Sequence, residues 1–473
     1  MKKSLFIFIL FLFSVILMQG IISCKKTTFL TQGGNLSFSV DTLRFDTLFT
    51  TMGSVTRSFK IYNDNKQAVR INQIRLENGQ QSAYRMNIDG VATQAIQNVE
   101  IAPNDSIYVF VAITIDPTSA TNPFIVQDKV LITLNENTSE IPLEAFGQDA
   151  HYIVGEILDS QTWINDKPYV IIHSALVDTN AVLTIQKGCR IYMHQDSKLY
   201  VAGTLNVFGT KTDSVIFQGD RLDRDYFGYK DYPGEWRGID FLNTGWQSIM
   251  NYCIVKNAGI SDAAILVRPP DKNLGVANML EMNNCTIANS ASYGVLCINS
   301  KVLMNNCLVH TCGLQSVAMI EGGDYRMNFC TIATYGGIGI NHAQQPSVAI
   351  LNYRDTSLTG YTGANLNLIM NNCVVDGSLE DEIVLAKKNN WTFSVSINHC
   401  AFKRKTALDN ALVSPVNTLF NVQPQFKDYA KWDFHIEATS ALKGAGISVP
   451  IVIEDMDGIP RPNPPSIGCY EAL

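Results

Sequence analysis

Apolar side chains alternate with polar or outward-facing residues in several segments of the first third of this chain. Apolar residues stand at every second position from Ile107 to Ile115, and shorter alternations occur near Phe59 and Ile71. Because successive side chains of a strand point to opposite faces, this pattern predicts strands that bury one face. Roughly seven such strands separated by turn residues predict an immunoglobulin-like β-sandwich over residues 36–150.

A different pattern, a repeated six-residue phrase, runs between residues 250 and 402. Its fullest form is Met-Asn-Asn-Cys-Thr-Ile, from Met282 to Ile287. The steps from Cys285 to Cys307 and from Cys307 to Cys330 are 22 and 23 residues. A period of this length predicts a solenoid, in which each repeat buries its apolar face against its neighbours.

The residue types indicate a solenoid of strands. Helical repeats need apolar positions spaced three and four apart over ten or more residues, and the repeat does not supply them. Cys and the residue two positions later instead share one face of a strand. Asparagine tolerates left-handed backbone angles, and its amide can bond to the same residue about 4.8 Å away in the next coil. The asparagines at this bend are therefore expected to form a ladder: Asn251, Asn283, Asn305, Asn328, Asn371 and Asn398.

This arrangement resembles the right-handed parallel β-helix of the pectate-lyase type, expected here over residues 151–425. The segments 59–63 and 101–106 of the predicted sandwich resemble the abnormal-spindle/hydin-like class of immunoglobulin-like modules. The whole chain is thus expected to be all-β, with an immunoglobulin-like sandwich followed by a right-handed parallel β-helix.

Residues 1–24 read as a targeting segment. Lys2 and Lys3 precede an apolar run that is too short to span a bilayer comfortably, which favours a cleaved signal. The end of the segment, Ile-Ile-Ser-Cys, resembles the bacterial lipobox, and this implies that Cys24 is lipidated. The expected product is an exported outer-membrane lipoprotein, with residues 25–35 as a linker. The acidic residues that follow the cysteine in many surface lipoproteins of Bacteroides-like bacteria are missing, so periplasmic and surface orientations both stay open.

The C-terminal residues 426–473 leave the repeat. Their segments 432–436, 440–446, 455–462 and 467–471 resemble the choice-of-anchor Q region, which ends many bacterial β-helix proteins. An open solenoid end needs a cap over its unpaired strand edges, and we expect this region to supply it. Asp455 and Asp457 are candidate calcium ligands; a turn with an Arg461 ion pair is the alternative.

Net charge and cysteine content limit the classes of partner and the disulfide bonds that the sequence predicts. The formal net charge is −7, or about −9 without the two signal lysines, which argues against nucleic acid as a partner. Ten cysteines remain besides Cys24, and six of them share one phase of the repeat. Stacked neighbours on parallel strands have poor disulfide geometry, so mostly reduced, buried thiols are expected. No spacing of His, Asp or Glu suggests zinc, and no cofactor is expected apart from possible calcium.

The insertion at residues 220–236 is the densest candidate binding site. Its aromatic side chains could stack on sugar rings while its carboxylates bind hydroxyl groups or calcium. The candidate ligand-binding residues are Asp223, Asp225, Tyr226, Tyr229, Tyr232, Glu235 and Trp236, together with Arg268 from a later insertion. The alternative is a solvated, self-paired loop with Trp236 packed on the first coils.

The pattern assigns no catalytic residue. Hydrolases of this fold need paired carboxylates on adjacent strands, and its calcium-dependent lyases need clustered carboxylates with a basic residue. Neither constellation is visible on consecutive coils. The sequence therefore favours a protein that binds carbohydrate or cell-envelope glycan without cleaving it. A polysaccharide lyase or glycoside hydrolase is one alternative, and a structural or adhesive scaffold for protein partners is another. The oligomeric state is left open.

Overall fold

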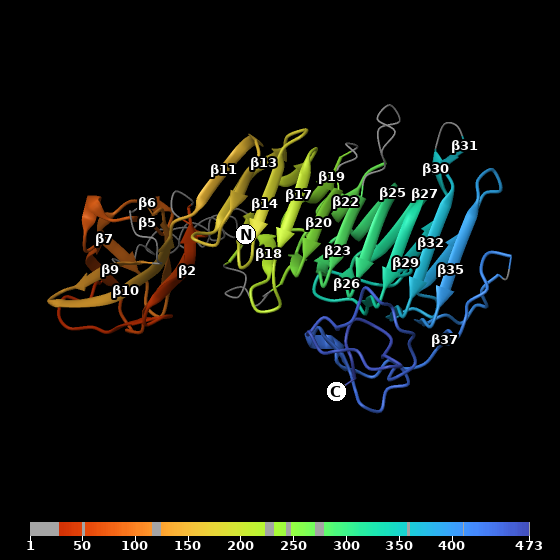
Figure 1. Ribbon diagram of the computed structural model, residues 1–473. Coiled ribbons are helices and arrows are strands. Elements are labelled where there is room, and N and C mark those ends of the chain that lie inside the picture. Colours follow the sequence, from red (N-terminus) through yellow and green to blue (C-terminus); the bar gives the residue numbers. More distant parts are fainter. Residues whose placement is uncertain are drawn as a thin grey trace, which may run out of the picture. The chain divides into compact units, whose positions relative to one another are not determined.

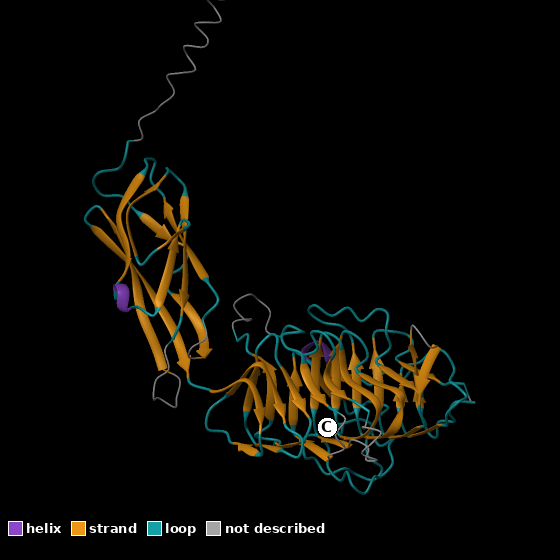
Figure 2. Ribbon diagram, turned by 90° about the horizontal axis from the view of Figure 1, so that it is seen from above, coloured by secondary structure: helices purple, strands orange, loops and turns teal. Residues whose placement is uncertain are grey.

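The computed structural model describes residues 28–49, 53–115, 124–222, 231–242, 247–269, 279–356, 360–409 and 411–472. The chain divides into two compact units, Met1–Gln148 and Asp149–Leu473 (Figure 1). Strands are the main regular elements of both units, and loops connect them (Figure 2). Within the described ranges, no helix is long and apolar enough to cross a membrane.

The first unit is an immunoglobulin-like sandwich of two five-stranded sheets. One sheet has, in spatial order, β1 (Leu36–Phe38), β3 (Arg57–Asn63), β8 (Ser106–Ile113), β5 (Tyr84–Ile88) and β6 (Val91–Ala92). The other has β2 (Leu43–Phe49), β10 (Asn137–Gln148), β9 (Phe124–Leu134), β4 (Val69–Leu76) and β7 (Ala95–Ile101). All pairs are antiparallel except β10 with β2.

Alternation explains most of this sandwich. In β8 the inward residues Ile107, Val109, Val111 and Ile113 are buried in a core shared by both sheets. The described residues hold ten strands rather than the predicted seven. The extra strands include β6, both residues of which are exposed, and β7, which has only one fully buried residue. Such strands carry no clear alternation, so the sequence pattern did not reveal them.

The second unit is a parallel β-helix whose coils stack into three sheets, here called sheets I, II and III. The long strands β11 (His151–Leu158) and β13 (Tyr169–Val177) each turn from sheet I into sheet II. Sheet I continues with β15 (Arg190–Met193), β18 (Val215–Gly219), β21 (Cys253–Lys256), β24 (Thr286–Ser290), β26 (Leu308–Cys312), β28 (Thr331–Thr334), β33 (Val374–Gly377), β36 (Ala401–Phe402) and β37 (Leu419–Phe420).

Sheets II and III share two long strands, β25 (Tyr293–Asn305) and β27 (Val317–Asn328). Sheet II also has β16 (Lys198–Val201), β19 (Gly238–Phe241), β22 (Ala263–Val267), β29 (Val348–Leu351) and β34 (Ile383–Ala386). Sheet III also has β12 (Gln161–Trp163), β14 (Val182–Gln186), β17 (Thr204–Phe208), β20 (Gln247–Asn251), β23 (Met279–Asn283), β32 (Leu366–Asn371) and β35 (Phe393–Asn398). An antiparallel hairpin of β30 (Tyr353–Thr356) and β31 (Gly360–Gly363) interrupts one coil.

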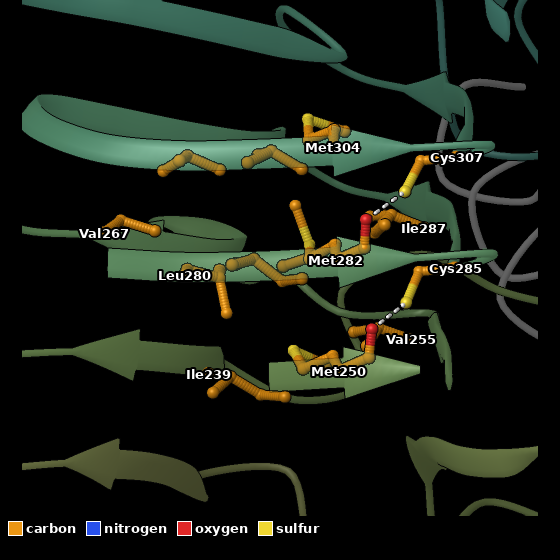
Figure 3. Packing of buried hydrophobic residues seen from close by; sticks show 14 of the residues in the cluster. Ile239, Met250, Val255, Val267, Leu280, Met282, Cys285, Ile287, Met304 and Cys307 are labelled. Atoms are coloured by element: carbon orange, nitrogen blue, oxygen red, sulfur yellow. Dashed lines mark hydrogen bonds between the residues drawn. The ribbon is translucent and has the colours of Figure 1, made fainter. Parts of the chain in front are cut away.

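One continuous apolar core fills the helix. At its first coils Trp163 stacks on Tyr169, with ring centroids 4.3 Å apart. After the last coils Leu408, Leu412 and Val413 pack against the same core. Along the sheet III–sheet I corner, Cys285 and Cys307 lie beside Met250 and Met282 of the preceding coils (Figure 3). The thiol of Cys285, for example, donates to the carbonyl of Met250 at 3.2 Å.

All ten cysteines among the described residues are free and buried. Burial raises the pKa of the thiols of Cys253 and Cys297. The cysteines therefore act as apolar filling with a weak donor, as the shared phase of the repeat suggests.

The asparagine ladder runs the length of the repeated phrase. Five of the six side-chain amides donate to the Oδ1 of the ladder residue one coil earlier, from Asn283 to Asn251 at 2.9 Å through Asn398 to Asn371 at 3.0 Å. The left-handed backbone belongs to the next residue instead. It is found at Tyr252, Asn284, Asn306, Phe329, Asn372 and His399. We expected one asparagine both to form the ladder and to adopt the left-handed bend. In the structure the ladder residue forms the bonds, and the residue after it adopts the bend.

The C-terminal residues lie along the side of the helix, over sheet I. They include β38 (Phe426–Asp428), the short 3-10 helix η3 (Tyr429–Lys431) and β39 (Asp433–Ile436). Apolar residues of this tail pack on the outward side chains of sheet I. Asn372 anchors it through bonds to Ile447, at 2.7 and 2.8 Å. This cover explains why β26 and β28 are buried on both faces.

Candidate functional site

A cleft of about 690 Å³ opens where the tail meets the turns between sheets I and II. The turns contribute Asp231, Asn289, Thr311 and residues 335–338, and the tail contributes residues 429–432. This volume lies in the range of small-molecule and oligosaccharide sites, about 300–1,000 Å³. The cleft is therefore large enough for a ligand of a few sugar units.

Aromatic rings form one side of the cleft. Tyr335, just after β28, stacks on Tyr429 of η3 with ring centroids 4.2 Å apart. Trp432 follows η3 and has a left-handed backbone, with φ of 64°. The side chain of Asp428 accepts from the backbone N–H of Lys431 and so caps the short helix. Tyr429 is 49% exposed. The local turn thus presents two aromatic side chains at the cleft.

A buried histidine, His310, packs against the ring of Trp432. The ring of His310 lies 5.1 Å from that of Trp432 and 4.9 Å from that of Phe434. Burial lowers the pKa of His310 to about 3, so the ring is neutral at ordinary pH. Its Nδ1 is 3.0 Å from the hydroxyl of Thr311. His310 therefore acts as an uncharged packing and hydrogen-bonding group.

Charges in the cleft are balanced. Asp231 pairs with Lys256 at 2.9 Å, and Lys431 pairs with Asp428 at 3.0 Å. Behind the aromatic side, the hydroxyl of Tyr335 donates to Asp376 at 2.6 Å. Burial raises the pKa of Asp376 and that of Tyr335, whose pKa the Asp376 charge raises further. The cleft thus combines aromatic surface with polar groups and has no net charge from these pairs.

Half of the residues predicted for ligand binding lie outside the described residues: Asp223, Asp225, Tyr226 and Tyr229. Tyr232 is described, is 37% exposed and lies against Gly339, next to the cleft-lining turn. Asp231, its neighbour in the same insertion, lines the cleft itself.

Two other predicted ligand residues belong to the interior. Trp236 is fully buried in the core of the helix, and its Nε1 donates to the carbonyl of Lys256 at 2.9 Å. Glu235 is also buried, against Gly219. Predicting Trp236 as a sugar-stacking residue was therefore wrong, because its apolar ring fills the core of the coil that contains β18 and β19.

Arg268 belongs to an ion network that the sequence did not reveal. It binds both oxygens of Asp240 at 2.8 and 2.9 Å. Lys198, which is almost fully buried, donates to Asp240 at 3.3 Å and to Asp262 at 2.6 Å. Strands β16, β19 and β22 bring these residues together, although insertions separate them widely along the chain. The basic groups already occupy both oxygens of Asp240, which favours a structural role over a calcium or catalytic site.

The candidate calcium ligands in the tail are likewise engaged. Asp455 accepts from the backbone N–H groups of Asp457, Ile459 and Glu471, each at 2.8 Å. Asp457 accepts from His435 at 2.8 Å. Arg461 pairs with Glu471 rather than with either aspartate. Across the described ranges, no three His, Cys, Asp or Glu side chains are grouped to hold a metal ion.

Comparisons with known proteins identify no family for this chain. No protein-family model matches the sequence, and no curated protein has a significant match. Solved structures that match parts of the chain include PapD-like domain 7 of human CEP192, an ASH/PapD-like domain, with 7% identity and a TM-score of 0.18; the match covers 27% of this chain and 96% of that domain. Another is a family 123 glycoside hydrolase from Clostridium perfringens, with 10% identity and a TM-score of 0.18. That match covers 24% of this chain and about a quarter, 26%, of the hydrolase.

Proposed function

We propose that this protein is an exported lipoprotein, tethered to the outer membrane at Cys24, and that its β-helix binds carbohydrate without cleaving it. The binding site in this proposal is the cleft between the sheet I–sheet II turns and the tail. The observation that carries it is the aromatic side formed by Tyr335, Tyr429 and Trp432 beside paired polar groups.

Sugars suit such a surface because each pyranose ring has an apolar face and a polar rim. Aromatic rings remove the apolar face from water, while a few placed polar groups orient the hydroxyls. The carboxylates described near the cleft have partners: Lys256 for Asp231 and Tyr335 for Asp376. This supports binding rather than hydrolysis, since an acid–base pair needs carboxyl groups that reach the substrate.

The tether is supported by the sequence at residues 21–24 and by the tail's resemblance to the choice-of-anchor Q region. Metabolic labelling with an alkyne palmitate tests it. The labelled lipid should appear on the wild-type protein and be absent from Cys24→Ala. Equal labelling of both proteins would exclude Cys24 as the acceptor.

Affinity electrophoresis tests the binding. The mature protein runs through gels cast with plant, host and bacterial glycans, and the gels are then stained for clearing. Retardation without clearing, lost in Trp432→Ala and Tyr429→Ala, is the expected result. Tyr108→Ala is the matched control, since this exposed aromatic residue lies in the sandwich. Clearing would establish an enzyme instead. Lack of retardation on every glycan would favour a scaffold that binds protein partners.

A further inference from the structure

A second row of left-handed turns runs along the corner between sheets I and II. Asn257, Asn289 and Thr311 occupy equivalent positions in three successive coils, with φ of 61°, 55° and 54°. Asparagine adopts this conformation readily, whereas a β-branched residue such as threonine rarely does. The third position is also the one that lines the cleft beside Asn289. The row therefore has asparagine in its first two coils and threonine in the third, at the cleft.

The amides in this row have a defined direction. The row of hydrogen bonds begins at Asp231, whose Oδ1 accepts from Lys256 at 2.9 Å and from the side-chain amide of Asn257 at 3.4 Å. A carboxylate only accepts, so Asn257 must turn its Nδ2 toward Asp231 and its Oδ1 toward the next coil. There the Nδ2 of Asn289 donates to that Oδ1 at 2.9 Å. The Oδ1 of Asn289 is consequently the terminal acceptor.

Nothing in the described part of the chain donates to this terminal oxygen. An asparagine at position 311 would continue the row, as Asn289 does for Asn257, but Thr311 stands there. The hydroxyl of Thr311 is engaged with His310 at 3.0 Å. Asn289 is only 1% exposed and lines the cleft. An oriented acceptor on a nearly buried side chain is thus available where a ligand would lie.

The charges around the cleft limit the ligand that can supply this donor. The Asp231–Lys256 and Lys431–Asp428 pairs leave no excess positive charge among them. Uronic acids and sulfated sugars are bound by cations that face the ligand. A neutral hydroxyl needs only an oriented acceptor.

We propose that Asn289 determines specificity by accepting a hydrogen bond from a hydroxyl group of a neutral oligosaccharide, which completes the amide row across the cleft. This inference rests on the proposed carbohydrate binding. The row from Lys256 through Asp231 and Asn257 positions the acceptor, and the aromatic side holds the sugar ring against it.

Isothermal titration calorimetry on the full mature protein tests the proposal. The probes are neutral cello-, manno-, xylo- and laminari-hexaose, with oligogalacturonate as the acidic arm. Wild type should bind at least one neutral hexaose more tightly than oligogalacturonate. Asn289→Gly, which keeps the left-handed turn, should weaken that binding about tenfold. Asn284→Gly is the matched control, because it removes an asparagine with φ of 55° at the other corner, whose Oδ1 accepts from Asn306, and its affinity should equal that of wild type.

A second variant separates binding from folding. Thr311→Asn should extend the amide row and replace the strained threonine, so its melting temperature should equal or exceed that of wild type. It should nevertheless bind the hexaose about tenfold more weakly, because its own amide donates to Asn289. Unchanged affinity in both Asn289→Gly and Thr311→Asn, or preference for oligogalacturonate, would overturn this inference while leaving carbohydrate binding intact. Failure of wild type to bind any probe would instead contradict the proposed function.

Discussion

Replacing Asn305 by leucine should destabilise the middle of the β-helix. Asn305 donates to Asn283 at 2.8 Å and accepts from Asn328 at 2.9 Å, so the change removes two ladder bonds. The bond to Asn283 contributes about 1 kcal/mol, and leaving the Asn328 amide without its acceptor costs about 1–3 kcal/mol. Asn328 is buried, and we therefore expect a total loss of about 2–4 kcal/mol.

Asn398→Leu is the matched control for this prediction. Asn398 stands at the last rung and bonds to only one ladder neighbour, Asn371 at 3.0 Å. Neither Asn305 nor Asn398 has a left-handed backbone, so leucine adds no turn strain at either position. The control should lose about 1 kcal/mol.

Hydrogen exchange measured by mass spectrometry provides the readout, because a stack of coils need not unfold in one step. Amide protection of β23 and β25 should fall at least about thirtyfold in Asn305→Leu. In Asn398→Leu the protection of the last coils should fall only about fivefold. Equal losses of protection in the two variants, or unchanged protection in Asn305→Leu, would refute the reasoning that the number of ladder bonds sets how much each asparagine stabilises the β-helix.

Three further predictions concern the interior and the tail. Trp236→Ala should lower the free energy of unfolding by about 3–5 kcal/mol in chemical denaturation, because it leaves a cavity in the core beside β18 and β19; a loss below 1 kcal/mol would contradict its burial. Burial lowers the pKa of His435, but hydrogen bonds to Asp457 and Asp433 outweigh it and raise the pKa above its ordinary value. The stabilisation is therefore complete below about pH 6.5 and is lost as the pH rises through the folded-state pKa. His435→Asn should consequently reduce the melting temperature more at pH 5.5 than at pH 9, and an equal reduction would count against the ion pairs. Finally, a thiol reagent should modify none of the ten buried cysteines until denaturant is added. Fast reaction in the native protein would show that the thiols are accessible to solvent.

The repeated phrase revealed the β-helix well because its information is local and repeated. Met, Asn and Cys recur at fixed offsets, and these offsets decide which side chains stack in neighbouring coils. The same phrase did not reveal which residue adopts the left-handed bend. Tyr252, Phe329 and His399 take that conformation in three of the copies, so residue type alone does not identify the position.

The cleft could not be predicted because it depends on the path of the tail. Tyr335 and Tyr429 stack on each other but are far apart in the chain. The tail reaches sheet I through apolar contacts such as Phe434 on Leu308, and hydrophobic periodicity does not record such a contact. The aromatic content of the insertion at residues 220–236 made it the predicted binding site. Of its described residues, Asp231 lines the cleft, while Trp236 fills the core.

A crystal structure of the mature protein with a neutral hexaose that it binds would test the central claim most directly. We expect a pyranose ring against Trp432 or Tyr429, with one hydroxyl within hydrogen-bond distance of the Oδ1 of Asn289. A sugar bound elsewhere on the β-helix or on the sandwich, with the cleft empty, would contradict the account.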